Sequence, residues 1–234
     1  MNWTSIGKRL GAALVVMIGI SMLIFAIARV MPGDPARIAL GPNATAEQVA
    51  ALRAERHLDA PLPVQYFEFL KALSRGDLGK SLYTNRPVTT DIAQFLPATL
   101  ELCIVSAIVM VLLGLPIGIL SAHFRGRVPD HLGRLVALIA VCTPAFVWGV
   151  ILQLFFGYFW PIFPIEGQLM QSTPVPPHVT GFLLVDTLVA GNGAAFLDAL
   201  YHLVLPATAL AMSGLGQCAR LTRSNMIEVY DKPY

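Results

Sequence analysis

A run of 25 residues, 97–121 (PATLELCIVSAIVMVLLGLPIGILS), constrains the fold more than any other part of the sequence. Its single charged side chain, Glu101, comes near its start. A helix rises about 1.5 Å per residue, so a helix of this length exceeds the roughly 30 Å hydrocarbon core of a bilayer. Because lipid offers no hydrogen-bond partners to the backbone, the run can cross a membrane only as a helix.

The remainder of the chain has a similar character. Hydrophobic residues make up 56% of the sequence and charged residues 13%, whereas soluble domains carry about 25% charged residues. The sequence therefore predicts an all-α integral membrane protein with four transmembrane helices. A further apolar run, 182–190, contains Asp186 and is too short to span. The four predicted spans lie at about 10–30, 97–121, 135–160 and 201–219.

These spans divide the chain into three parts. Residues 1–30 hold the N-terminus and the first transmembrane helix, residues 31–96 form an insertion, and residues 97–234 carry the other three spans. An outer loop, 161–200, lies within the third part. It is rich in proline over its first half and contains no Lys or Arg.

The insertion is predicted to be helical. Thr45 and Gln48 have the spacing of a capping box, which predicts a helix through about Leu58. Apolar side chains then recur at helical spacing and predict a second, amphipathic helix to about Ser74. Its apolar face has three possible partners: a neighbouring helix, the membrane surface or another protein. We favour packing within the insertion. The residues of that face are Val64, Phe67, Leu70 and Leu73.

Basic residues predict the orientation, because loops that flank spans are enriched in Lys and Arg on the cytoplasmic side. The N-terminus, the 122–134 loop and the C-terminal tail are therefore predicted to be cytoplasmic, with 31–96 and 161–200 outside. The net charge of +2 is too small to suggest a nucleic-acid partner. The basic residues concerned are Lys8, Arg9, Arg125, Arg127, Arg134, Arg220, Arg223 and Lys232.

Two glycines within the 97–121 span predict a close helix–helix contact. Gly114 and Gly118 form a GxxxG pattern around Pro116, and Ala122 extends the row of small residues. Such a row lets another helix approach closely, which is how helices pack where the solvent is itself apolar.

Four polar residues near or within spans are candidate functional residues. Glu101 lies in the first turn of its predicted span, where the helix dipole favours a carboxylate, and Arg29 ends the first span at similar depth. We expect either an outer-interface ion pair between them or a contact of Glu101 with a substrate path. Ser213 and Gln217 lie on the fourth span and are expected to line a cavity or to bond a neighbouring helix.

Motifs of catalysis are missing from the sequence. It has no HExxH, GxSxG or phosphate-binding glycine loop. We therefore expect no catalytic, cofactor or metal site in this chain.

Six sequence segments carry a family resemblance. These segments occur in the family's order from the start to the end of the chain. They resemble the dipeptide/oligopeptide/nickel-type permeases of ABC importers, and most of all the first of the two permease subunits. The segments are Gly33-Asp-Pro-Ala36, Leu62-Pro-Val-Gln-Tyr66, Arg75-Gly-Asp-Leu-Gly-Lys-Ser-Leu82, Leu96-Pro-Ala-Thr-Leu-Glu-Leu102, His202-Leu-Val-Leu-Pro-Ala-Thr-Ala209 and Arg220-Leu-Thr-Arg-Ser-Asn-Met-Ile-Glu-Val229.

The resemblance implies a type I importer in a bacterial inner membrane. Two permeases would form a heterodimer around the path of a dipeptide, an oligopeptide or a similar small solute. Two cytoplasmic ATPase subunits would bind ATP and Mg²⁺, and a periplasmic solute-binding protein would dock on 31–96 and 161–200. We expect Gly114 and Gly118 to contact the partner permease.

The family pattern has six spans, with a cytoplasmic coupling helix and two more spans after the fourth. The 234 residues contain four, so we expect a chain that is C-terminally incomplete and that does not transport in this form. Two alternatives remain open at this point: a truncated remnant that does not transport, and an intramembrane enzyme.

Overall fold

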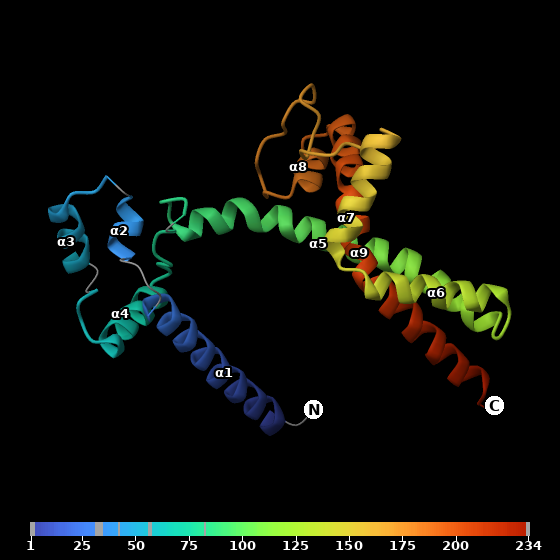
Figure 1. Ribbon diagram of the computed structural model, residues 1–234, viewed down its shortest axis with the longest axis horizontal. Helices are drawn as coiled ribbons and strands as arrows, with labels where there is room; N and C mark the ends of the chain where they lie inside the picture. The colour runs from blue at the N-terminus through green and yellow to red at the C-terminus, as the bar shows by residue number, and fades with distance from the viewer. Residues whose placement is uncertain (1–2, 31–34, 42, 56–57, 82, 233–234) are drawn as a thin grey trace. The chain divides into compact units, whose positions relative to one another are not determined.

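The computed structural model describes residues 3–30, 35–41, 43–55, 58–81 and 83–232, and in these residues the fold is helical. It separates into two compact units, Met1–Ile92 and Ala93–Tyr234. Helix α5 crosses the boundary between them (Figure 1). The elements are α1 (Trp3–Val30), α2 (Pro35–Leu40), α3 (Ala46–Glu55), α4 (Leu62–Ser74), α5 (Val88–His123), α6 (Val128–Cys142), α7 (Ala145–Gln153), the π-helical η1 (Leu154–Phe159), α8 (Leu183–Val189) and α9 (Gly193–Tyr230).

The predicted helices of the insertion are present. At the start of α3, the Thr45 amide donates to the Gln48 side chain at 3.0 Å and the Gln48 amide donates to Oγ1 of Thr45 at 3.3 Å. This reciprocal pair is a capping box, and it satisfies two amides that the first helical turn leaves without partners. The predicted end of α4 at Ser74 also agrees with the structure.

The favoured partner of α4 was wrong. Val64, Phe67 and Leu73 remain exposed. A different pair of α4 residues, Tyr66 and Phe69, instead packs on Phe25 of α1, with ring centroids 5.4 and 5.6 Å apart. The Tyr66 hydroxyl also lies 2.8 Å from Oγ of Ser21 on α1, and aromatic pairs favour such tilted and edge-on geometries.

Helix α9 is the centre of the second unit, since α6, α7 and α8 all contact it. It begins eight residues before the predicted span, because Asn192 caps it by accepting the amide of Ala195 at 3.0 Å. Its buried face consists largely of alanines, with Leu215 and Gly216. At Gly216 an added Cβ would lie within van der Waals overlap of the Ala137 carbonyl of α6. Small residues therefore let the helices of this unit approach closely.

The predicted span 135–160 is broken rather than continuous. The helix direction bends by 104° at Thr143 and Pro144, between α6 and the segment that α7 and η1 form. Proline forces the residue before it out of the helical region, and Thr143 has φ −95° and ψ 122°. Three helices in the described residues are long and apolar enough to cross a membrane, or four if the bent pair forms one span.

Residues 160–182 of the outer loop follow an irregular path, and the short apolar run after them forms the seven-residue α8. Asp186 of α8 fastens this loop. Its carboxylate accepts Oγ1 of Thr180 at 2.7 Å and the backbone amides of residues 179–181. The hydroxyl bond from Thr180, followed by the amide bonds, holds the pKa of Asp186 below its usual range even though burial opposes the charge.

Candidate functional site

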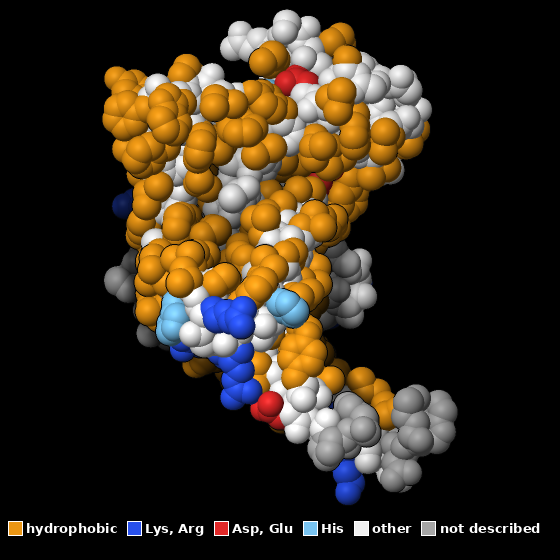
Figure 2. All heavy atoms as spheres, turned by 90° about the vertical axis from the view of Figure 1, so that its right-hand side faces the viewer, with side chains coloured by type: hydrophobic (Ala, Val, Ile, Leu, Met, Phe, Trp, Pro, Cys, Tyr) orange, Lys and Arg blue, Asp and Glu red, His pale blue; other side chains and the backbone are white. Residues whose placement is uncertain are grey.

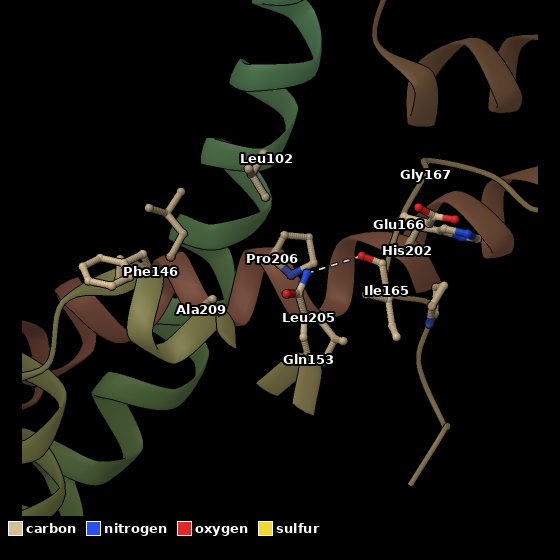
Figure 3. A pocket seen from close by; sticks show the side chains of 14 residues that line it. Leu102, Phe146, Gln153, Ile165, Glu166, Gly167, His202, Leu205, Pro206 and Ala209 are labelled. Atoms are coloured by element: carbon tan, nitrogen blue, oxygen red, sulfur yellow. Dashed lines mark hydrogen bonds between the residues drawn. The ribbon is translucent and has the colours of Figure 1, made fainter. Parts of the chain in front are cut away.

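A cavity of about 480 Å³ lies in the second unit between α5, α7, α9 and the chain that follows η1. Its size falls in the range of roughly 300–1,000 Å³ that is usual for small-molecule sites. Figure 3 shows Leu102 of α5 and Phe146 of α7 at one end, and Glu166 and His202 at the other. The cavity is therefore apolar at one end and ionisable at the other.

The wall between these ends is built around Gln153, the last residue of α7. Its amide group donates to the carbonyl oxygen of Ile165 at 3.4 Å, the dashed contact in Figure 3. Ile165 also packs on Gly157 of η1, where an added Cβ would lie 2.6 Å from Cγ1 of Ile165. These contacts hold Glu166, the next residue along the chain, at the edge of the cavity.

His202 is fixed by the preceding turn of α9. Its Nδ1 lies 2.9 Å from the Asp198 carbonyl oxygen and 3.2 Å from Oδ1 of the same residue. Both neighbours are acceptors, so Nδ1 carries a hydrogen and Nε2 is left to accept a hydrogen bond, or to donate one when the ring is protonated.

Asp198 also ties the outer loop to α9. It accepts the Met170 amide at 2.9 Å and Oγ1 of Thr173 at 2.6 Å. The same side chain therefore orients His202 and anchors the loop over this end of the unit. Pro206, one turn after His202, has no N–H to donate to the His202 carbonyl, which leaves an additional acceptor beside the cavity.

Chemically, the site offers groups for binding rather than for bond cleavage. It has one carboxylate, one imidazole and an apolar wall. Among the described residues, no group of three or more His, Cys, Asp or Glu side chains is arranged to hold a metal ion. Such a cavity fits a small molecule that has both an ionic and an apolar part.

The small-residue row lies against α9 of the same chain. A Cβ added at Gly114 would lie 2.9 Å from Cβ of Cys218, and one added at Gly118 would lie 2.6 Å from Cβ of Thr222. The expected contact with a partner permease is thus corrected: α5 uses these glycines for packing inside its own chain. Contact with α9 buries both glycines.

Glu101 is buried, with 7% of its surface exposed, and it accepts the Leu184 amide at 2.7 Å. The carboxylate of Glu101 therefore gives a hydrogen-bond partner to one of the first amides of α8, which have none within the helix, and the helix dipole favours a negative charge at that end. The side chain of Arg29 lies outside the described residues, so the predicted ion pair with Glu101 stays a prediction.

Ser213 and Gln217 lie on the exposed side of α9. Ser213 donates to the Leu210 carbonyl within its own helix at 2.8 Å. Gln217 accepts from Nη2 of Arg220 at 2.6 Å. Neither residue lines the cavity described above.

The sequence analysis did not predict the most buried Asp–Arg ion pair described in the second unit. Asp130, in the first turn of α6, has 1% of its side chain exposed and accepts Nε and Nη2 of Arg223 at 2.7 and 2.9 Å. It also accepts the Gly126 amide at 2.9 Å, and Nε of Arg134 lies 3.4 Å away. Such a two-pronged bond fits the planar guanidinium and fixes the ends of α6 and α9 together.

One signal for these missed residues was available in the sequence. A charged residue next to or inside an apolar segment requires a partner, and Asp130, Asp198 and Arg223 all meet that description. Which partner each one takes depends on the folded helices, because Asp130 and Arg223 are 93 residues apart.

Family models match nearly the whole chain. A model described as "Binding-prot-dependent transport system membrane comp, N-term" matches residues 4–103. A second, described as "Binding-protein-dependent transport system inner membrane component", matches residues 114–234. Together they cover both units of the structure.

Individual proteins agree with these models. The chain is 42% identical over 233 residues to the "Probable D,D-dipeptide transport system permease protein DdpB" of Escherichia coli (strain K12), covering 99% of this chain and 68% of that protein. It is 37% identical to the "Di/tripeptide transport system permease protein DppB" of Pseudomonas aeruginosa (strain UCBPP-PA14), covering 98% and 68%.

A relative that is named for a different solute is also similar. The "Glutathione transport system permease protein GsiC" of Salmonella typhimurium (strain LT2) is 33% identical over 228 residues, covering 97% of this chain and 65% of that protein. These matches and the helical membrane fold lead to one conclusion: the chain belongs to the family of binding-protein-dependent transport system inner membrane components, and it is a multi-pass transport permease.

Proposed function

We propose that this permease forms half of the path by which an ABC importer moves dipeptides or similar short peptides across the inner membrane. The names of its relatives support this class of solute, because they specify D,D-dipeptides, di- and tripeptides, and glutathione. All of these solutes carry an ammonium group, a carboxylate and peptide groups. A path for them has to accept both charges without holding them tightly.

The observation that carries the proposal is the cavity between α5, α7 and α9. Glu166 would accept the ammonium group, and Nε2 of the His202 imidazole would accept a peptide N–H. The solute's side chains would lie against Leu102 and Phe146. Glu166 is exposed at the edge of the cavity, so its attraction is screened by water. Weak binding suits a path, since a solute has to leave as readily as it enters.

The proposed assembly is the one that the resemblance to ABC importer permeases implies. A second permease would complete the path, two ATPase subunits would bind ATP and Mg²⁺ on the cytoplasmic side, and a periplasmic binding protein would deliver the peptide. The insertion 31–96 and the loop 161–200 would face that binding protein. The exposed apolar face of α4, with Phe67 65% exposed, supports a contact surface there.

The proposed orientation places the N-terminus, the 122–134 loop and the C-terminal tail in the cytoplasm. Two ion pairs support the placement of the last two on one side. Arg125 contacts Asp231 at 3.1 Å, and Asp130 contacts Arg223 at 2.7 Å. Both pairs join the short basic loop to the end of α9.

The test is peptide uptake by the intact importer in proteoliposomes. Glu166→Gln removes the negative charge and keeps the shape, so uptake of a dipeptide with a free amino group should fall by up to about fivefold, since an exposed ion pair contributes about 0.2–1 kcal/mol. ATP hydrolysis stimulated by the binding protein should persist, because Glu166 lies away from the cytoplasmic end.

Glu47→Gln is the matched control. Glu47 is an exposed glutamate in the first turn of α3, outside the unit that holds the cavity. Because Glu47 lies in the insertion that is proposed to face the binding protein, the compared quantity is the ratio of uptake of a free-amino dipeptide to uptake of its N-acetylated form, which Glu47→Gln should leave unchanged and Glu166→Gln should lower. Normal dipeptide uptake by the Glu166→Gln importer would show that the cavity is not part of the path.

A further inference from the structure

A second cavity of about 400 Å³ lies between the ends of α5, α6 and α9, apart from the proposed peptide site. Three arginines line it: Arg134 of α6, and Arg220 and Arg223 of α9. Asp130 is the carboxylate that bonds into this group, and it is already engaged by Arg223. Three guanidinium groups against one carboxylate leave an excess of positive charge.

Two of the arginines keep donors for a ligand. A guanidinium has five N–H groups. Arg134 is half exposed and contacts Asp130 and Nδ1 of His131, while Arg220 is exposed and donates to Gln217. Arg223 uses Nε and Nη2 on Asp130. The charge that is available to a ligand therefore comes mainly from Arg134 and Arg220.

The rest of the lining is apolar and forms a stripe along each helix. On α6, Arg134 is followed at helical spacing by Leu138 and Val141, which span about 10 Å of the helix axis. On α9, Arg220 and Arg223 follow Gly216 at the same spacing. Both helices thus place their cations at one end of the cavity and their apolar residues toward the other.

The apolar end continues onto a surface that faces away from the protein. Leu135 and Leu138 of α6 are 52% and 60% exposed. Figure 2 shows Lys, Arg and His side chains gathered at one end of a broad apolar face. In a membrane protein, cations at the end of an apolar helical segment lie at the level of the lipid headgroups.

We propose that this cavity binds an anionic phospholipid, with its phosphodiester on Arg134 and Arg220 and an acyl chain along Leu138 and Val141. Guanidinium groups match phosphate oxygens in geometry and charge. Inorganic phosphate would use the arginines but not the apolar stripe, and the stripe of about 10 Å would contact the first part of an acyl chain. The proposal depends only on residence in a membrane and not on the solute that is transported.

The experiment titrates the purified full chain in detergent with phosphatidylglycerol, and separately with phosphatidylcholine, and counts bound lipids by native mass spectrometry. The test variant is Arg134→Gln/Arg220→Gln, which leaves the Asp130–Arg223 pair intact. Each basic residue near an anionic lipid surface contributes about fivefold to binding, so the double variant should bind phosphatidylglycerol about 25-fold more weakly. Phosphatidylcholine should bind weakly to both proteins.

Arg125→Gln/Arg127→Gln is the matched control, since it removes the same charge from exposed arginines between α5 and α6 that do not line the cavity. It should retain phosphatidylglycerol. Equal losses in both double variants would overturn the proposal in favour of diffuse surface charge. Equal binding of phosphatidylcholine would overturn it as well.

Two further outcomes concern other occupants. Displacement of phosphatidylglycerol by inorganic phosphate at equal concentration would show a phosphate site without a lipid. Loss of ATPase subunits from the importer in the double variant, with lipid binding unchanged, would assign the arginines to a protein contact. If the double variant does not fold, the single variants Arg134→Gln and Arg220→Gln should each weaken lipid binding about fivefold, and unchanged binding in both would refute the site.

Discussion

The contact between α5 and α9 can be tested with a single methyl group. At Gly118 an added Cβ would lie 2.6 Å from Cβ of Thr222 and 2.7 Å from the carbonyl oxygen of Ala219. The second of these atoms is backbone, so it can move only if α9 moves. Gly118→Ala should therefore push the two helices apart.

The expected magnitude is the balance of two effects. Overpacking of a close contact costs about 1–3 kcal/mol, and replacing glycine by alanine inside a helix returns about 1 kcal/mol. For Gly118→Ala we expect a net loss of up to about 2 kcal/mol in the free energy of unfolding, toward the upper end because the obstacle is backbone. Gly114→Ala should cost less, because its nearest obstacle is the side chain of Cys218 at 2.9 Å.

Gly149→Ala is the matched control in the same unit. Its added Cβ would lie 3.9 Å from Cβ of Ala209, an ordinary contact, so this variant should be neutral or slightly more stable. The assay is unfolding of the purified chain in mixed micelles by titration with sodium dodecyl sulfate, read by circular dichroism. If Gly118→Ala unfolds at the same detergent fraction as Gly149→Ala, α5 and α9 do not pack through this row.

Three further predictions concern the ends of the second unit. Asp130→Asn should destabilise it by about 2–4 kcal/mol in the same titration, because Arg223 loses its charged partner; an unchanged midpoint would contradict a structural pair. The Asp186 carboxylate stabilises the outer loop when ionised, and its pKa is lowered in the folded chain. Protection of this loop from protease should thus hold above about pH 4, the usual carboxyl range, and decline as pH falls through the lowered pKa, whereas Asp186→Asn should lack that decline. In a cysteine-free background, a membrane-impermeant thiol reagent applied to intact cells with a permeabilised outer membrane should label Gln171→Cys and not Arg127→Cys, and the reverse pattern would overturn the proposed orientation.

Several features of the fold were determined by the sequence alone because they depend on neighbouring residues. The 97–121 run had to be a helix in any tertiary context, since its length and apolar character leave no other structure in lipid. The capping box of Thr45 and Gln48 closes over three residues and formed as predicted.

The faces of these helices and the partners of their charges were decided only by tertiary structure. Periodicity placed Val64 and Phe67 on the packed face of α4, yet Tyr66 and Phe69 contact α1. Glu101 takes its partner 83 residues away, at Leu184. In lipid the hydrophobic effect does not distinguish one apolar face from another. Close packing and buried polar contacts select the face instead, and both require the distant segments to be in place.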